Sequence, residues 1–434
     1  MSQTVSPASP PPPARVRPAT HSLSPRFWFA AGSLLVLLLY ALLPPARTFL
    51  GVQDHGRWFL DSYAVLASSD AAPLGIDPSA PNPLDIFHRS HKYSDWWFVL
   101  GKMGFTRDDN FLVGGAWVLA FLAAVFLTVR PATRRETLWL VLLMASPPVL
   151  LGVIRANNDL VIFAVLALVL WSVQSSSGPR IALTIALLVL ATGLKFYPVV
   201  AVAIFLLVPE PRRMLAALVL GTIATGGLLA TMFAQVMRGT FHIEPEIFTF
   251  GGRIALMDFG LPEKIASLAV IPVLAVLAVV ALRMRWTMGI APAAEPGVAD
   301  TPAARGSALL AASLLVACFV SGINHGYRWI FALWAAPWCW ATRDRNPASR
   351  LAVWLLPICL WHDGLLVLAT GLFFPHLQQD QYDRILVVWR WITEPVTWAL
   401  MVIFAAGMLE LALARWREIR FGFGPGKSPE SSAT

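Results

Sequence analysis

Charged residues are scarce in this chain. Asp, Glu, Lys and Arg make up 13% of its 434 residues, whereas an ordinary soluble domain has roughly 25%. Hydrophobic residues reach 57%, and the mean hydropathy is +0.65. This composition excludes an ordinary soluble protein and predicts a polytopic membrane protein. Eighteen Trp residues fit that class, because Trp gathers where hydrocarbon meets water.

Cysteine and nucleotide-binding motifs are also scarce or missing. The three Cys residues, Cys318, Cys339 and Cys359, lie in apolar segments without a CxxC pair, so neither a disulfide framework nor a zinc site is indicated. The sequence has no Walker motif, HExxH or GxSxG, which disfavours a nucleotide-driven pump and a soluble-type hydrolase. No residue is assigned to a metal or other cofactor, and a need for a divalent metal stays open.

The net charge of +8 is spread over many short loops. Basic residues in such loops set membrane topology, so no nucleic-acid partner is predicted. The Pro-rich segment Met1–Arg26 is typical of a disordered tail. The apolar run Phe27–Leu43 has no small-residue cleavage site and is interpreted as the first spanning helix rather than a signal peptide.

Apolar runs predict an all-α bundle of about twelve transmembrane helices. Several runs are shorter than the ~20 residues of a full span, which indicates tilted or broken helices. The bundle occupies 27–412, with a long first extracytoplasmic loop at 45–110, and 413–434 is a basic cytoplasmic tail. The predicted helices are 27–43, 111–129, 137–153, 159–174, 181–194, 196–208, 214–236, 265–282, 307–321, 329–342, 351–373 and 388–412.

The positive-inside rule then places both termini in the cytoplasm. With that orientation the basic connections, such as 130–135 and 343–350, lie inside. The clusters that carry chemically versatile side chains lie outside. They include Asp54 and Asp61, the turn 155–159, Lys195, 253–258 and the turn 324–328.

The first outer loop contributes two carboxylates near the membrane surface, Asp54 and Asp61. A carboxylate within hydrogen-bond reach of a hydroxyl can accept its proton. If Asp54–Tyr63 is helical, the spacing of seven puts both carboxylates on one face. The alternative is that such residues are only solvated or cap a helix, which is the interpretation preferred for Asp77.

Lys195 lies between two apolar runs, where a lipid-facing lysine costs about 2.5–3.5 kcal/mol. Gly193 and Pro198 indicate that the chain breaks there, close to the outer surface. A basic group at that depth suits an anionic ligand such as a lipid phosphate. A lysine that snorkels at an ordinary helix end is the alternative.

The turn Asn324–Arg328 brings a His and an Arg together. Arg328 can bind phosphate oxygens bidentately, and His325 can donate to phosphate or transfer a proton. A simple interfacial belt containing Tyr327 is the alternative. A second polar turn contains Arg155, Asn157, Asn158 and Asp159. It is either part of a site or a salt-bridged hairpin between helices. The candidate substrate-binding residues are Arg57, Arg155, Asn158, Asp159, Arg253 and Tyr327.

In four places the chain resembles the GT-C superfamily of integral-membrane glycosyltransferases, in particular the bacterial α-mannosyltransferase branch that uses polyprenyl-phosphate sugars. These are the acidic first loop with Gly75-Ile76-Asp77-Pro78, the hairpin Arg155–Asp159, the break Gly193–Pro198, and the turn Asn324–Arg328 before Trp329-Ile330-Phe331. The likeness extends over about 27–412.

The resemblance implies an inverting transfer of a sugar, by family analogy mannose, to a lipid or glycan acceptor at the outer face of the bacterial inner membrane. A first-loop Asp would be the general base. This is Asp54 or Asp61, and Asp54 is favoured because it lies closer to the first helix. Lys195, His325 and Arg328 would hold the leaving phosphate.

Two other classes remain open. His362, Asp363 and Glu394 fall within apolar helices, and ionisable groups there favour a proton-coupled transporter or a lipid-linked sugar flippase. A non-catalytic assembly protein is the third class, but it gives no reason for Asp, Lys, His and Arg to share one face.

Overall fold

The structure, a computed structural model, is a helical bundle with 78% helix and 1% strand. It describes residues 23–51, 57–175, 177–239, 246–291, 301–374 and 376–422. The segment 1–22, Asp54 and residues 423–434 lie outside the described residues. The predicted all-α class is confirmed.

Each predicted apolar run contains helix, and further short helices lie in segments predicted as loops. In chain order, before the first polar turn, they are α1 (Pro25–Leu42), α2 (Pro44–Phe49), α3 (Leu60–Ala71), η1 (Ala72–Leu74), η2 (Asp95–Phe98), α4 (Val99–Lys102), η3 (Arg107–Asp109), α5 (Asn110–Thr128), α6 (Arg134–Met144) and α7 (Pro147–Arg155). The remaining elements are α8 (Asp159–Ser172), α9 (Gly178–Leu194), η4 (Tyr197–Leu207), α10 (Pro211–Thr231), α11 (Phe233–Gly239), β1 (Thr249–Phe250), α12 (Gly252–Asp258), α13 (Glu263–Arg283), α14 (Pro302–Ser321), β2 (Asn324–His325), η5 (Gly326–Phe331), α15 (Ala332–Thr342), α16 (Pro347–Phe373) and α17 (Gln379–Gly422).

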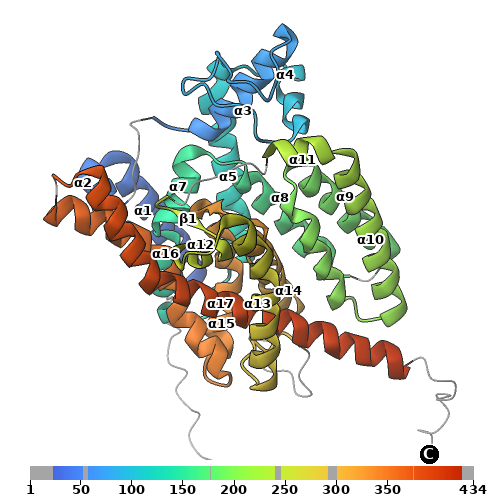
Figure 1. Ribbon diagram of the computed structural model, residues 1–434. Helices are drawn as coiled ribbons and strands as arrows, with labels where there is room; N and C mark the ends of the chain where they lie inside the picture. The colour runs from blue at the N-terminus through green and yellow to red at the C-terminus, as the bar shows by residue number, and fades with distance from the viewer. Residues whose placement is uncertain are drawn as a thin grey trace, which may run out of the picture.

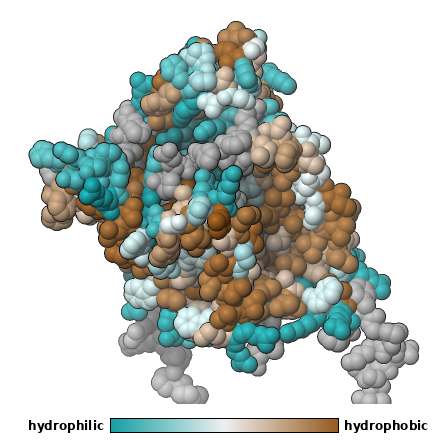
Figure 2. Space-filling view, viewed as in Figure 1, coloured by the Kyte–Doolittle hydropathy of each residue, from teal (hydrophilic) through white to brown (hydrophobic). Residues whose placement is uncertain are grey.

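Among the described residues, seven helices are long and apolar enough to cross a membrane, and the bent pair α6–α7 makes eight. The elements α8, α9, η4 and α15 coincide with predicted helices but have only 14, 17, 11 and 11 residues. The count of twelve spans and the membrane topology therefore stay predictions. Hydrophobic side chains cover the helical middle of the molecule, and hydrophilic ones gather along its lower edge and over much of its upper end (Figure 2).

Prolines and capping side chains explain several helix boundaries. Ser24 accepts a hydrogen bond from the backbone of Phe27 at the start of α1, which satisfies a free N–H of the first turn. Pro147 and Pro148 open α7 and lack the N–H groups that would continue α6. The axes of α6 and α7 consequently differ by 56°. Helix α7, which ends at Arg155, lies in the upper part of the bundle in Figure 1.

The segment from α3 to η3 forms a cap over one end of the bundle (Figure 1). The indole N–H of Trp97 donates to the carbonyl of Leu194 at 3.0 Å. The backbone N–H of Phe59 donates to the carbonyl of Ile154 at 2.6 Å. The cap is therefore docked on the ends of both α9 and α7.

Of the segment Asp54–Tyr63, considered above as a possible helix, residues 57–63 are described, and they are helical only from Leu60 onward. Helix α3 begins only at Leu60, because Phe59 adopts a left-handed conformation with φ of 62° and turns the chain. The same turn carries Asp61, in the first turn of α3, toward the end of α7.

Gly193 lets the cap approach α9 closely. A Cβ atom added at Gly193 would overlap the indole ring of Trp96. We expect Gly193→Ala to destabilise the protein by about 1–3 kcal/mol, since an overfilled contact must displace its neighbours. Gly115→Ala is the matched control, because its Cβ meets nothing within 4 Å. Thermal unfolding in detergent checks both variants, and an equal effect of the two would contradict this packing.

The two short strands pair antiparallel, with Thr249 opposite His325 and Phe250 opposite Asn324. The backbone of Gly326 donates to the carbonyl of Phe248. The backbone of Phe248 in turn donates to Asp363 Oδ2 at 3.0 Å. His325 is thereby held in a ladder that is anchored on α16.

Candidate functional site

The candidate site lies where the cap meets the ends of α7, α9 and α14. Four separate chain segments contribute to one connected group of side chains, which we call the junction cluster. Its members are Asp61, Arg89, Tyr93, Arg155, Asn157, Asn158, Asp159, Lys195, Tyr197, His325, Tyr327 and Arg328.

Asp61 is almost fully buried and is held by the first polar turn. Arg155 binds it through two nitrogens, with Nη2 to Oδ1 at 2.7 Å and Nε to Oδ2 at 3.1 Å. The amide of Asn157 donates to Oδ2 at 2.6 Å, and Arg89 Nη1 lies 3.6 Å from Oδ1. Burial raises the pKa of Asp61, but Arg155, Asn157 and Arg89 together lower it below its ordinary value. Asp61 is therefore an ionised carboxylate at neutral pH.

Asp159 and Lys195 form the second half of the junction cluster. Lys195 Nζ lies 2.6 Å from Asp159 Oδ1 and donates to Asn158 Oδ1 at 2.7 Å. The hydroxyl of Tyr197 also donates to Asp159 Oδ1, at 2.6 Å. The predicted break after Gly193 is confirmed: α9 ends at Leu194, and Lys195 is extended. Lys195 therefore turns inward to a carboxylate, and the snorkelling alternative is wrong.

The turn 155–159 joins α7 to α8 and forms salt bridges with other segments, and in the described contacts its two charged residues do not pair with each other. Ala156 ends α7 in a left-handed conformation with φ of 42°. This turn separates the two charged side chains. Arg155 consequently binds Asp61, while Asp159 binds Lys195.

The turn 324–328 supplies the fourth segment of the cluster. Arg328 Nε lies 3.9 Å from Asp159 Oδ2, and its guanidinium lies over the ring of Tyr197 at 4.9 Å. His325 and Tyr327 have ring centroids 5.4 Å apart. The ring of Tyr327 also faces Lys195 Nζ at 5.6 Å. His325, Tyr327 and Arg328 are therefore all brought to the two carboxylates.

Some buried donors in the junction cluster have no acceptor. Within the part of the chain that the structure describes, neither Arg328 Nε nor Asn158 Nδ2 has a hydrogen-bond partner, and the same holds for the acceptor Asp159 Oδ2, which lies 3.9 Å from Arg328 Nε. A buried polar group without a hydrogen-bond partner destabilises the folded protein. The cluster and its neighbour Asp85, which pairs with Arg89, contain four basic side chains and three carboxylates. The basic residues are Arg89, Arg155, Lys195 and Arg328, and the acidic ones are Asp61, Asp85 and Asp159. The surplus positive charge and the unmet donors make this site suited to an anion.

Titration at the site is set mainly by burial. Burial lowers the pKa of His325 to about 4, partly opposed by the charge of Asp61. Burial also raises the pKa of Tyr93 and Tyr327 well above the ordinary value. At neutral pH the imidazole is neutral, and both hydroxyls keep their protons. All three can donate a hydrogen bond without bringing a further charge.

The neutral state of His325 predicts a pH dependence of stability. Its folded pKa of about 4 lies below the ordinary 6.5, so the unfolded chain binds a proton first as the pH falls. Stability is fully present above pH 6.5 and declines toward pH 4, by up to about 3 kcal/mol. Comparing the thermal unfolding of wild type with that of His325→Gln across this window isolates the contribution of His325. Parallel curves for the two proteins would contradict it.

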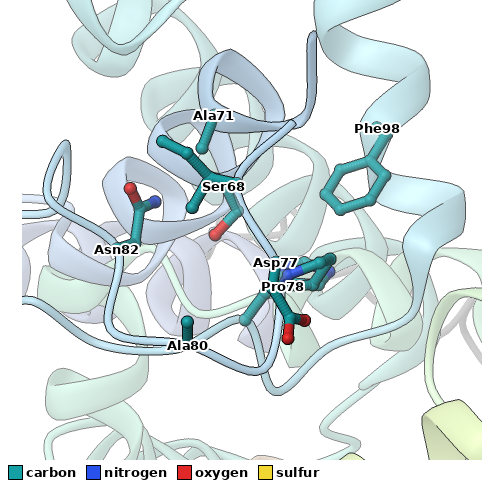
Figure 3. A pocket seen from close by; sticks show the side chains of 9 residues that line it. Ser68, Ala71, Asp77, Pro78, Ala80, Asn82 and Phe98 are labelled. Atoms are coloured by element: carbon teal, nitrogen blue, oxygen red, sulfur yellow. The ribbon is translucent and has the colours of Figure 1, made fainter. Parts of the chain in front are cut away.

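Other predicted residues are placed elsewhere. Arg253 Nη1 pairs with Glu263 at 3.1 Å, on α12 and α13. Arg57 is exposed, and no described contact joins it to the junction cluster. Asp77 is exposed, and its Oδ1 accepts from the backbone of Ser79 at 2.8 Å within a local turn rather than at a helix end. A cavity of about 10 Å³ beside Asp77 and Pro78 (Figure 3) has room for one water at most.

Several members of the junction cluster were not predicted as site residues. Arg89 and Tyr93 lie in an irregular part of the cap, where no periodicity assigns a face. Asn157 and Tyr197 lie next to predicted residues in the two polar breaks of the chain, and this position was the available signal.

Among the described residues, no group of three or more His, Cys, Asp or Glu could hold a metal ion. Comparison of the chain with family models, curated proteins and solved structures gives no match.

Proposed function

We propose that this protein is a glycosyltransferase of the bacterial inner membrane. It moves a sugar, by family analogy mannose, from a polyprenyl-phosphate donor to a hydroxyl of a lipid or glycan acceptor. The observation that carries this proposal is the junction cluster, where a buried carboxylate lies among cations at the end of a membrane-length helical bundle. Asp61 is the base in this scheme, and Asp54, outside the described residues, is the second candidate.

The phosphate of the donor suits the half of the cluster near Arg328. Its oxygens can accept from Arg328 Nε and Asn158 Nδ2, two buried donors of the cluster that have no hydrogen-bond partner among the described residues. Lys195 and the neutral His325 border the same space, as their contacts with Tyr327 indicate. These groups would stabilise the negative charge that grows on the leaving phosphate in the transition state.

The transfer needs one proton acceptor. Asp61 takes the proton of the acceptor hydroxyl while the hydroxyl oxygen attacks the anomeric carbon. The bond from that carbon to the phosphate oxygen breaks, and the polyprenyl phosphate leaves with the electron pair. Configuration is inverted, because attack and departure occur on opposite faces of the sugar.

Arg155 links phosphate binding to the basicity of Asp61 in this scheme. It keeps the pKa of Asp61 low, which makes Asp61 a weak base while the pair is intact. A bound phosphate attracts the same guanidinium and weakens its hold on Asp61. Donor binding would therefore raise the basicity of Asp61 at the moment when it is needed.

The cap and the junction cluster are proposed to face outward. The basic connections 130–135 and 343–350 belong to the opposite end of the helices, and such loops are retained in the cytoplasm. A lipid-linked donor and acceptor can then approach the cluster from the outer leaflet.

A proton-coupled transporter or flippase is the second candidate function. His362 Nδ1 lies 3.0 Å from Asp363 Oδ1 on α16, and Glu394 is buried on α17. Both helices are long enough to span a membrane, and ionisable groups there are typical of proton pathways. The junction cluster lies at one end of the bundle, however, rather than in its middle as a transport site would.

The test uses purified full-length protein and radiolabelled polyprenyl-phosphate sugars. Transfer of label to an alcohol or glycolipid acceptor, with inverted anomeric configuration, is expected. A matched assay follows movement of the same donor across proteoliposomes. Movement of intact donor without transfer would refute the transferase and favour the transporter.

A further inference from the structure

Asp363 is an acidic residue inside α16 that the proposed transfer reaction does not use. Its Oδ2 accepts a hydrogen bond from the backbone N–H of Phe248 at 3.0 Å, and its Oδ1 lies 3.0 Å from His362 Nδ1. Only 14% of its side chain is exposed. Both carboxylate oxygens therefore face a nitrogen of the protein, and one of these nitrogens belongs to the segment that leads into β1.

Phe248 depends on such a partner because of its backbone conformation. Its φ of 59° is left-handed, which is disfavoured for a residue with a side chain and persists only where the surroundings hold it. Asp363 binds its N–H, and its carbonyl accepts from the backbone N–H of Gly326. A Cβ atom at Gly326 would lie 3.0 Å from that carbonyl oxygen. Phe248 therefore connects Asp363 to Gly326 through close backbone contacts.

The same backbone contact continues along both strands. Thr249 pairs with His325 in the antiparallel ladder. At the far end of the contact, a Cβ atom at Gly251 would overlap the carbonyl oxygen of Gly322. The segment 248–251 therefore lies directly against 322–326, and the position of one backbone sets that of the other.

The imidazole of His325 depends on this backbone for its direction. Among the described residues its ring makes no hydrogen bond, and it packs against the ring of Tyr327 with centroids 5.4 Å apart. We propose that Asp363 is a positioning residue for His325. Through Phe248 and Gly326 it holds the β2 backbone so that the imidazole stays beside Tyr327 in the junction cluster.

This role gives Asp363 a part in the transfer reaction without requiring it to carry a proton. The inference rests on the proposed function for its chemical consequence, since the imidazole is held where it can donate to the leaving phosphate. The positioning itself can be measured without a donor.

The first test follows the imidazole of His325 by NMR in the full-length protein, with isotope-labelled histidine and in detergent. The variant His325→Gln lacks this signal and thereby assigns it. In wild type, burial lowers the pKa of His325 to about 4 from the ordinary 6.5. Asp363→Leu keeps a side chain of similar size but offers Phe248 no acceptor. Water should then reach the released turn, and the pKa of His325 should rise above about 5.

Two further variants separate positioning from a general disturbance of α16. Asp363→Asn keeps an oxygen that can accept from Phe248, so the pKa of His325 should stay as in wild type. Thr370→Val is the matched control, because in the described contacts the Thr370 hydroxyl donates only to carbonyls of its own helix. An unchanged pKa of His325 in Asp363→Leu, or an equal rise in Thr370→Val, would overturn the proposal.

Hydrogen exchange on wild type keeps the proposal testable if Asp363→Leu does not fold. The backbone amides of Phe248 and Gly326 both donate within this arrangement. They should exchange at least about a hundredfold more slowly than in an unstructured peptide. Unprotected exchange at Phe248 would show that Asp363 does not hold it, and the proposal would fail.

Sugar transfer supplies a readout that a purely structural role would not reproduce. Asp363→Leu and His325→Gln should each lower transfer about tenfold, as the loss of one hydrogen bond to a charged group predicts. Because Asp363 acts through His325, the double variant should be no slower than His325→Gln alone. Losses that multiply would overturn the proposal. If wild type transfers no sugar, the proposed function fails, and the NMR titration still decides whether Asp363 positions His325.

Discussion

Asp61→Asn is expected to lower sugar transfer by about 10²–10⁴-fold, the usual contribution of a general base. Asn keeps the size of the side chain, and its one oxygen, at the position of Oδ2, can still accept from Arg155 Nε and from Asn157. It cannot take the proton of the acceptor hydroxyl. The expected loss therefore lies in kcat, with donor affinity retained. Single-turnover transfer and donor binding, measured on the same preparation, check this prediction.

Two carboxylates of the same segment are the controls. Asp77 is exposed and accepts only a local turn hydrogen bond in the described contacts, which Asn makes equally well. Asp77→Asn should keep transfer within about twofold of wild type. Asp54→Asn separates the two candidate bases. If Asp54→Asn abolishes turnover while Asp61→Asn retains it, Asp61 has only a structural role.

The sequence predicts the helices well because their signal is local. A continuous apolar run and its ending at Pro, Gly or a polar cap are enough to place α1, α5 and α13 within a few residues. The break around Lys195 is predicted on the same grounds, from Gly193 and Pro198. The number of membrane spans is harder to predict, because elements such as η4 are apolar but have too few residues to cross a membrane alone.

The partners within the candidate site could not be predicted from the sequence. Asp61 and Arg155 are 94 residues apart, and the turn at Ala156 decides that Arg155 binds Asp61. An Ala in a left-handed conformation has no sequence signature comparable to Gly. Arg89 reaches the site through the irregular part of the cap, where each contact depends on how the cap docks. The residue types were therefore predictable, whereas their pairing required the structure.

The largest effect on stability is expected for the buried pair of Lys195 and Asp159. Lys195 is 8% exposed and Asp159 is fully buried, so removing one partner leaves a charge in a low-dielectric setting. Lys195→Met should destabilise the protein by about 3–5 kcal/mol. Adding Asp159→Asn removes the second charge while keeping an acceptor for Tyr197. The double variant should recover most of the lost stability, measured by thermal unfolding in detergent.

The same double variant tests whether Lys195 has a role in sugar transfer besides its ion pair with Asp159. If Lys195 serves only to neutralise Asp159, the stable double variant should transfer sugar as wild type does. If its ammonium group also holds the leaving phosphate, the variant should stay at least about tenfold slower despite its restored fold, since such electrostatic contacts contribute several kcal/mol to catalysis. We expect the second result, because Arg328 Nε and Asn158 Nδ2 lie beside Lys195 and Asp159 and have no hydrogen-bond partner among the described residues. A fully active double variant would remove Lys195 from the phosphate site and leave Arg328 and His325 to hold the phosphate.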